Sequence, residues 1–181
     1  MHHDEIWQIY SRNGERIMNG GYPASLGNPS KESGLVYGAV ALWLYRKNKG
    51  TIELLWQHRS MKVDRNPGKW DLSAAGHINY GESKIDAAIR EAHEEIGVSI
   101  TADDLIFSHA RFNNYNNFYW IYFVDWTDKP DDFHFDDDEV SEVKWVPIED
   151  LDDFVKNCAK APLSKDYVHF EAVKDWLKEN A

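Results

Sequence analysis

The sequence predicts an α+β protein, because segments with the composition of β-strands surround one strongly amphipathic helix and precede two further helices. The amphipathic helix is indicated by apolar residues at steps of three and four between residues 83 and 97. Strands are indicated by short runs of branched and aromatic residues bounded by turn residues. The strands predicted in this way are 36–46, 51–59, 70–78, 105–112, 117–126 and 141–147, and the two later helices are 148–157 and 164–179.

The first 34 residues differ in character from the rest of the chain. Apolar and polar residues alternate over residues 4–22, and the dipeptide Asn13-Gly14 within them is typical of a tight hairpin turn. The next twelve residues, PASLGNPSKESG, are rich in Pro, Gly and Ser, as expected of a loop. We therefore expect a β-hairpin arm with a covering loop over residues 1–34 and one main domain over residues 35–181.

Composition and charge narrow the classes of function. The 181 residues carry a formal net charge of −11, which argues against binding nucleic-acid polymers or anionic membranes through general electrostatics. The single cysteine, Cys158, excludes an internal disulfide framework and fits a reducing compartment. No apolar run reaches membrane-spanning length, and the N-terminus lacks a signal-peptide core. We expect a cytoplasmic protein with a small-molecule ligand.

The helix between residues 83 and 97 has clear start and stop signals. Ser83 is a good N-cap residue, and Asp86 three positions later completes a capping-box pattern. Gly97 stands where a helix is expected to stop. One face of the helix is apolar and should be buried, through Ile85, Ala88, Ile89, Ala92 and Ile96.

A second face of this helix carries three glutamates, Glu91, Glu94 and Glu95. Each like-charge pair at this spacing should cost roughly 0.2–0.5 kcal/mol on an isolated helix. One explanation is a solvated acidic face on which Arg90 pairs with Glu94, four residues away. The other is that the carboxylates gather a hard divalent cation, which suits oxygen ligands and removes the repulsion.

The second explanation is favoured by a resemblance to a known family. Gly76, followed after five residues by Glu82 and after seven more by REAHEEIGV (90–98), resembles the complete signature of the Nudix hydrolases. The order of strands around it is also similar to the mixed sheet of that family, which lies between helices. The resemblance implies a Nudix fold and a pyrophosphohydrolase that cleaves a diphosphate linkage in a nucleoside diphosphate derivative or a related compound.

The resemblance also implies roles for the signature residues. Glu91, Glu94 and Glu95 would bind Mg²⁺ or Mn²⁺, and the carbonyl oxygen of Gly76 is a further candidate ligand. Such an acidic site can bind a diphosphate only through cations, which also lower the pKa of bound water. One carboxylate would then take the proton from that water. The sequence leaves open which glutamate is the base, and how many metal ions bind.

Two more signature residues are expected to support the glutamates. Arg90 would orient the carboxylates, and Glu82 would support the loop or an outer ligand of the metal.

Further candidates lie outside the signature. Some Nudix enzymes carry an extra catalytic acid just before a late strand, where this chain has Glu139 and Glu142. Trp70 and Tyr115 each flank a loop and are candidates for the substrate pocket. His77 is a candidate ligand, although a polar loop residue is the simpler interpretation.

The segment KWDLSAAGHINYGES resembles the active-site region of type I isopentenyl-diphosphate isomerases, which share the Nudix fold. Those isomerases need a cysteine immediately before the Gly-His pair, where this chain has Ala75. They also supply acids at the start of a later strand, near which this chain has Asn116 and Asn117. Since every member of the glutamate box is kept, we interpret the chain as an isomerase-like Nudix hydrolase.

Two alternatives remain: an isomerase of isoprenoid diphosphates, and a Nudix-shaped binding module without turnover. The sequence gives neither the substrate nor the oligomeric state, although many relatives are dimers and a homodimer is compatible with the resemblance.

Overall fold

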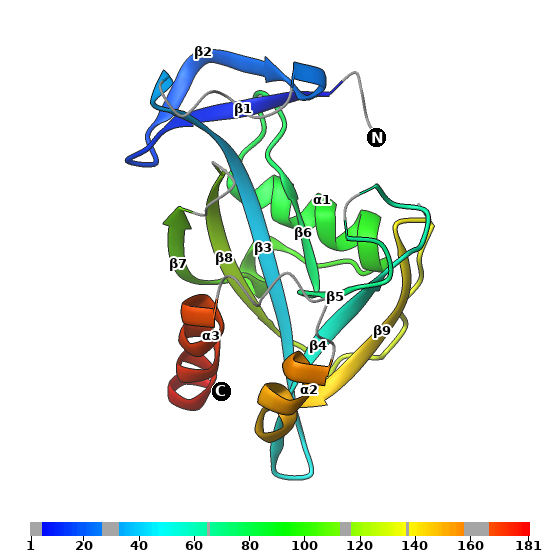
Figure 1. Ribbon diagram of the computed structural model, residues 1–181. Coiled ribbons are helices and arrows are strands. Elements are labelled where there is room, and N and C mark those ends of the chain that lie inside the picture. Colours follow the sequence, from blue (N-terminus) through cyan, green and yellow to red (C-terminus); the bar gives the residue numbers. More distant parts are fainter. Residues whose placement is uncertain (1–4, 27–32, 65, 113–116, 137, 158–166) are drawn as a thin grey trace.

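A computed structural model describes residues 5–26, 33–64, 66–112, 117–136, 138–157 and 167–181. Nine strands and three α-helices are defined in this part of the chain, together with short 3₁₀ turns (Figure 1). The strands are β1 (Ile6–Ser11), β2 (Arg16–Pro23), β3 (Leu35–Asn48), β4 (Thr51–Arg59), β5 (Trp70–Asp71), β6 (Ala74–His77), β7 (Ile106–Phe112), β8 (Asn117–Asp125) and β9 (Val140–Pro147). The helices are α1 (Lys84–Ile96), α2 (Leu151–Asn157) and α3 (Tyr167–Asn180).

The strands form a mixed sheet around the long strand β3. β3 runs parallel to β8 and antiparallel to β1, β4 and β6. Its hairpin to β4 turns at Lys49 and Gly50, which both have positive φ angles, as expected of a two-residue hairpin loop. The predicted α+β class and mixed sheet are confirmed.

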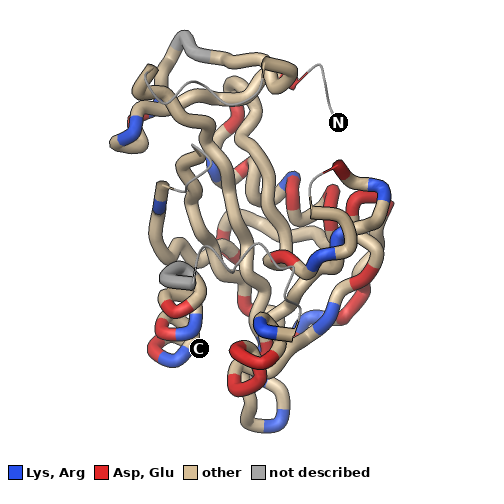
Figure 2. The backbone as a smooth tube through the Cα atoms, viewed as in Figure 1, with Lys and Arg blue, Asp and Glu red and all other residues tan. Residues whose placement is uncertain are grey.

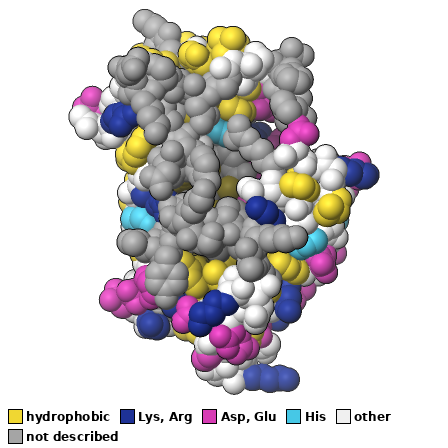
Figure 3. Space-filling view, viewed as in Figure 1, with side chains coloured by type: hydrophobic (Ala, Val, Ile, Leu, Met, Phe, Trp, Pro, Cys, Tyr) yellow, Lys and Arg dark blue, Asp and Glu magenta, His cyan; other side chains and the backbone are white. Residues whose placement is uncertain are grey.

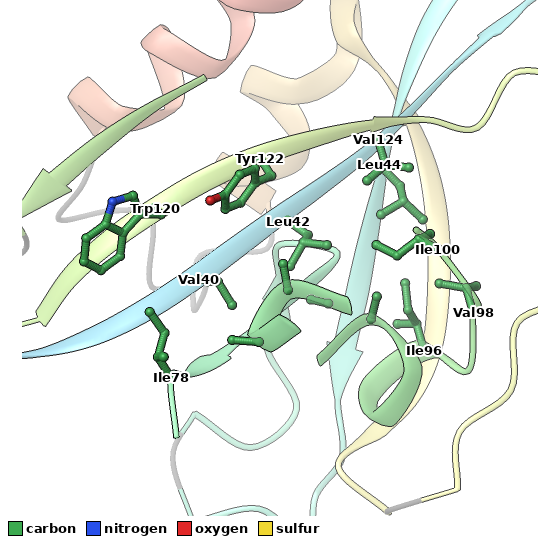
Figure 4. Packing of buried hydrophobic residues seen from close by; sticks show 14 of the residues in the cluster. Val40, Leu42, Leu44, Ile78, Ile96, Val98, Ile100, Trp120, Tyr122 and Val124 are labelled. Atoms are coloured by element: carbon green, nitrogen blue, oxygen red, sulfur yellow. The ribbon is translucent and has the colours of Figure 1, made fainter. Parts of the chain in front are cut away.

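Helices cover both faces of this sheet (Figure 1). Alternate residues of β3 point to opposite faces because the side-chain period of a strand is two. Val40, Leu42 and Leu44 pack toward α1, in the cluster that Figure 4 shows. Residues of α2 and α3 contribute to the other cluster together with Ala41 and Trp43. None of the helices in the described ranges is long and apolar enough to cross a membrane.

The helix α1 begins and ends as the sequence predicts. The Ser83 hydroxyl accepts a hydrogen bond from the backbone N–H of Asp86 at 3.1 Å, and it donates to the Asp86 carboxylate at 2.7 Å. Gly97 has a φ of 72° and donates its N–H to the last turn. A side chain at Gly97 would also meet His134, whose N–H donates to the carbonyl of Ile96. The position therefore needs glycine for both conformation and space.

The N-terminal hairpin is present and belongs to the same sheet. β1 pairs with β2 on one side and with β3 on the other. It also bonds to the segment after β6, because the N–H of Gln8 donates to the carbonyl of Ile78 and the N–H of Tyr80 donates to the carbonyl of Ile6. Hydrophobic side chains are exposed on this arm, at the top of Figure 3, and Met18 is the most exposed of them.

One strand assignment from the sequence is wrong. Residues 70–78 were expected to form a single short strand, but the structure has two, β5 on β4 and β6 on β3. The break is made by Ser73, whose hydroxyl donates to the carbonyl of Leu55 at 2.7 Å and accepts from the N–H of Leu44 at 2.9 Å. This buried hydroxyl satisfies backbone groups of β3 and β4 that a continuous strand would have paired.

The predicted start of the last helix at residue 164 lies outside the described residues, as does Cys158. The helix predicted over 148–157 is a short 3₁₀ turn followed by α2. Acidic positions occur in α1, α2 and α3, so the negative charge is distributed over several elements (Figure 2).

Candidate metal and catalytic site

The three glutamates of α1 differ in their exposure. Glu91 and Glu95 are 8% and 5% exposed, whereas the side chain of Glu94 is 49% exposed. Glu91 and Glu95 are four residues apart, so they lie on one face of the helix. Small residues such as Ala88 and Ala92 allow this helix to pack closely on the sheet. The helix therefore carries a pair of buried carboxylates beside one exposed carboxylate.

Glu95 is held from the sheet by two donors on the same oxygen. Its Oε2 accepts a hydrogen bond from the backbone N–H of Ala75 at 2.8 Å and another from the Nε2 of Gln57 at 3.0 Å. Ala75 belongs to β6 and Gln57 belongs to β4, which are separate branches of the sheet. The carboxylate thus lies where these two branches diverge.

Arg90 connects three of the signature carboxylates. Its Nε lies 2.9 Å from Glu82 Oε1, and its Nη1 lies 2.7 Å from Glu91 Oε1 and 2.8 Å from Glu94 Oε2. The Nη2 donates to the carbonyl of His77 at 2.9 Å. The predicted pairing of Arg90 with Glu94 is confirmed, and the like-charge repulsion along the helix is reduced by this guanidinium.

Glu82 also fixes the loop before the helix. Besides its contacts to Arg90, its Oε2 accepts the backbone N–H of Asn79 at 2.9 Å, while its own N–H donates to the carbonyl of Asn79. The loop from His77 to Glu82 is therefore held to α1 by a charged network. Roles for Glu82 and Arg90 in positioning the loop and the carboxylates are compatible with these contacts.

Gly76 lies directly against Glu91. A Cβ atom built on Gly76 would overlap the Glu91 carboxylate. Glycine is therefore required sterically, because any side chain would displace the carboxylate from the strand. Gly76 belongs to β6, where it pairs with Val40 of β3, so this contact places the Glu91 carboxylate directly against the strand backbone.

Burial raises the pKa values of acidic side chains at the site. Burial raises the pKa of Glu91 to about 7, against the opposing effect of Arg90. Burial also raises the pKa of Glu95, and the neighbouring charge of Glu91 raises it further. The pKa of Asp71 on β5 is raised for the same reason, burial, and its charge acts on Glu95. The buried carboxyl groups therefore hold their protons to a higher pH than exposed ones do.

The residues present fit a hard divalent cation. The side chains gathered here offer carboxylate oxygens, the ligand type that Mg²⁺ and Mn²⁺ take. The close approach of Gly76 to Glu91 leaves no room for a side chain that would block such an ion. Across the described ranges, no three His, Cys, Asp or Glu side chains form a metal cluster on their own. A cation here would therefore need ligands from the backbone or from substrate and water as well.

Some predicted residues lie away from the glutamates. Trp70 packs on His58 with a ring separation of 4.9 Å and on Phe154 at 5.5 Å, so its indole faces α2. The side chain of Glu142 is exposed and lies 3.9 Å from His58, on the same side as Trp70. Neither residue has a contact with the buried carboxylates in the described structure, and their proposed roles stay predictions.

Three other candidates have different surroundings. The ring of His77 is stacked on Trp7, with 3.7 Å between the ring centroids and an interplanar angle of 8°. Its backbone carbonyl accepts a hydrogen bond from Arg90. The carbonyl of Glu139 accepts the N–H of Ser60, which fixes the end of the acidic loop. Tyr115 lies outside the described residues.

The contribution of the sheet to this site was not predicted from the sequence. Gln57, Asp71 and Arg59 all act on Glu95, the first by a hydrogen bond and the other two by charge. A signal was available, because Gln57 interrupts the apolar run of β4 and Asp71 interrupts the short strand after it. Polar residues at inward positions of a buried strand need partners.

The fold and the site define an α+β protein with a carboxylate site on the helix α1, which follows β6 and its Gly76-His77 pair. The chain belongs to the Nudix family, since the NUDIX domain family matches residues 36–167.

Curated relatives agree with this assignment. The chain is 30% identical over 164 residues to Nudix hydrolase 3 of Arabidopsis thaliana, a match that covers 84% of this chain and 20% of the plant protein. It is 37% identical over 78 residues to an isopentenyl-diphosphate Delta-isomerase of Escherichia coli O17:K52:H18, covering 43% of this chain and 41% of the isomerase. The chain thus spans well under half the length of either relative.

Solved structures show the same fold. The chain superposes on DR0079 from Deinococcus radiodurans with a TM-score of 0.59 and 22% identity, covering 85% of this chain and 99% of that one. It superposes on the NUDIX domain of Shewanella oneidensis NrtR, crystallised with ADP ribose, with a TM-score of 0.60 and 20% identity, covering 78% and 88%. The Nudix fold expected from the sequence is confirmed.

Proposed function

We propose that this protein is a Mg²⁺- or Mn²⁺-dependent Nudix hydrolase that cleaves a diphosphate linkage in a nucleoside diphosphate derivative or a related small phosphorylated compound. The observation that carries the proposal is the buried pair Glu91 and Glu95, whose pKa values are raised by burial. Two such carboxylates are unfavourable side by side unless they are protonated or share a cation. A divalent cation, and through it a diphosphate, satisfies both at neutral pH.

Each residue of the site would have a distinct role. Glu91 and Glu95 would hold the cation together with the Gly76 carbonyl, and the more exposed Glu94 would complete the ligands or face the substrate. When bound, the cation neutralises charge on the phosphoryl oxygens and lowers the pKa of water beside it. Arg90 keeps Glu91 and Glu94 in place through its 2.7 Å and 2.8 Å contacts.

In the reaction, water attacks one phosphorus and the bond from that phosphorus to the bridging oxygen breaks. The proton of the water passes to a carboxylate, and the other phosphate leaves with the electron pair of the broken bond. Three glutamates are candidate bases, and the contacts of α1 do not single out one of them.

An isomerase is the runner-up, supported by the matched region of the Escherichia coli enzyme. Two features of this chain argue against it. Ala75 has no acidic or nucleophilic group, and its backbone N–H is used to hold Glu95. The ring of His77 is stacked on Trp7. A Nudix-shaped binding module is the third candidate, and the intact glutamates argue against it.

A cytoplasmic location and a homodimer also belong to the proposal. The single cysteine supports a reducing compartment. Sedimentation or gel filtration of the purified chain tests the dimer directly.

The function is tested by a substrate screen with Mg²⁺, in which chromatography follows the products. The panel comprises nucleotide sugars, ADP-ribose, dinucleotides, nucleoside triphosphates and isopentenyl diphosphate. ADP-ribose is included because a protein of this fold was crystallised with it. We expect cleavage of at least one diphosphate linkage by the wild-type protein and none by the double variant Glu94→Gln/Glu95→Gln.

Other outcomes of the screen would select the alternatives. Equal product from the wild-type protein and the double variant on every compound would favour the binding module. Conversion of isopentenyl diphosphate to its isomer without cleavage would favour the isomerase.

A further inference from the structure

Gln57 is a buried amide in the middle of a core strand. It is 1% exposed and stands in β4 directly after Leu54, Leu55 and Trp56, which are fully buried. Its Cα atom is paired with Asp71 of β5 on one side and with Val143 of β9 on the other. An apolar side chain would be the ordinary occupant of such a position.

The amide nitrogen of Gln57 has one partner, Glu95. The Nε2 donates to Glu95 Oε2 at 3.0 Å, and the N–H of Ala75 donates to the same oxygen at 2.8 Å. No hydrogen bond from the described residues reaches the second oxygen, Oε1. Two donors on one oxygen fix the rotation of the carboxylate and leave its other oxygen available.

The amide oxygen of Gln57 is buried away from hydrogen-bond donors of the described residues. In the described part of the chain, no donor lies within hydrogen-bond distance of this buried Oε1. A buried carbonyl oxygen without a donor costs free energy of folding. The amide is therefore an unfavourable choice for packing alone, and its one favourable contact is with Glu95.

We propose that Gln57 is a positioning residue of the metal site, which holds Glu95 Oε2 together with the backbone of Ala75 so that Glu95 Oε1 is presented to the cation. The inference rests on the proposed function, because it assigns Glu95 a role as ligand. Groups that orient a metal ligand from behind are known to influence metal affinity strongly, even though they do not contact the ion. Gln57 would have this effect from the sheet, while Arg90 acts on the other glutamates from the helix.

The test compares the only two glutamines of the chain. Gln8 is also fully buried, but its amide nitrogen donates to the backbone carbonyls of Ile9 and Ile17 within the arm. Gln57→Met and Gln8→Met each remove one buried amide and keep an unbranched side chain of similar length. Binding of Mn²⁺ to the purified proteins is measured by titration calorimetry and by electron paramagnetic resonance, with melting temperatures recorded in EDTA.

We expect Gln8→Met to melt at a lower temperature, because it loses the hydrogen bonds of a buried amide. We expect only Gln57→Met to lose affinity for Mn²⁺, by about 10-fold or more. Equal Mn²⁺ affinity of Gln57→Met and the wild-type protein would overturn the inference. The variant Glu95→Gln distinguishes a failure of this inference from a failure of the proposed metal site. If Glu95→Gln loses Mn²⁺ and Gln57→Met does not, only the inference on Gln57 fails. If Glu95→Gln binds Mn²⁺ as the wild-type protein does, the proposed metal site fails as well.

A second measurement needs no variant at position 57 and covers the case in which Gln57→Met does not fold. Wild-type protein labelled with ¹⁵N in glutamine has two pairs of side-chain NH₂ signals, which Gln8→Met assigns. We expect the Gln57 pair to shift as Mg²⁺ saturates the site while the Gln8 pair stays in place. A Gln57 pair that does not move while Mg²⁺ binds would overturn the inference.

Discussion

Both faces of the central sheet bury aromatic rings, but in the described part of the chain the buried glutamates lie on the face toward α1. The face toward α2 and α3 is filled by large rings, of which Trp43, Trp56 and Phe123 are fully buried. Trp43 and Trp56 contact each other edge to face, with 5.1 Å between ring centroids. The face toward α1 receives small helix residues such as Ala88, and the same helix buries the carboxylate of Glu95.

The face toward α2 and α3 therefore contributes mainly to stability, whereas the face toward α1 also carries the groups expected to bind the cation. Large buried rings remove much apolar surface from water and so contribute strongly to folding. Buried carboxylates oppose folding unless they are neutralised. The α1 face keeps them beside Gly76 and Arg90, where a cation and a substrate can use them. We therefore expect substitutions of the glutamates on the α1 face to reduce activity rather than stability, and substitutions of the rings on the other face to reduce stability rather than activity.

The largest effect is expected from Glu95→Gln, on the α1 face. The amide keeps the shape of the side chain but loses the charge that would bind the cation. Turnover of whichever diphosphate the screen identifies should fall by about 100-fold or more, since even partners behind a ligand are worth 10–100-fold. The melting temperature in EDTA should stay the same or rise, because an unfavourable buried charge is gone. Unchanged turnover would remove Glu95 from the list of ligands.

The opposite signature is expected from Trp56→Ala on the other face. Trp56 is fully buried and its ring contacts Trp43, Phe154 and Phe170. Truncation should reduce the free energy of unfolding by about 3–5 kcal/mol, measured in urea. The affinity of the folded fraction for Mn²⁺ should stay as in the wild-type protein. A loss of Mn²⁺ affinity as large as that of Glu95→Gln would show that the two faces are not independent.

A smaller effect concerns pH. Burial raises the pKa of Glu91 to about 7, and it also raises the pKa of Glu95. The metal-free folded protein therefore holds protons that the unfolded chain has released above its ordinary glutamate pKa of about 4.3. Stability from these groups is fully present below that pKa and is lost as the pH rises through about 7. Metal binding needs the deprotonated carboxylates, so cation and protons compete.

Thermal melts with and without Mg²⁺ measure this competition. At about pH 8, an excess of Mg²⁺ of about 100-fold over its Kd should add about 2.7 kcal/mol of stability. That corresponds to roughly 5–10 °C for a chain of this size. At about pH 5.5 the gain should be clearly smaller, because protons occupy the carboxylates. A gain that is equal at both values would contradict ligation by carboxylates with raised pKa values.

Local signals allowed the α1 side of the site to be predicted from the sequence. The cap at Ser83, the stop at Gly97 and the pairing of Arg90 with Glu94 all depend on spacing along a single helix. Helical spacing is regular, so residues three or four apart are neighbours whatever the rest of the fold does. The strands of the main sheet could be predicted for the same reason, because the patterns that indicate a strand are also local along the chain.

The sheet side of the site could not be predicted in this way. The partnership of Gln57 with Glu95 depends on how β4 lies against α1, and 38 residues separate them. The orientation of Trp70 toward α2 depends on the two short strands that Ser73 separates. A shift of one residue in a strand exchanges its two faces, so Trp70 and Asp71 could be assigned to a face only once the register was known.

The central claim is that Glu91 and Glu95 hold a divalent cation beside Gly76. It is tested most directly by a crystal grown at about pH 8, where the carboxylates are deprotonated, with Mn²⁺ located by its anomalous signal. We predict a peak bound by oxygens of Glu91 and Glu95, at about the 2.0–2.6 Å typical of such hard cations. A crystal that contains Mn²⁺ elsewhere, with Glu95 still bonded to Gln57 and Ala75 and no peak beside it, would contradict the account.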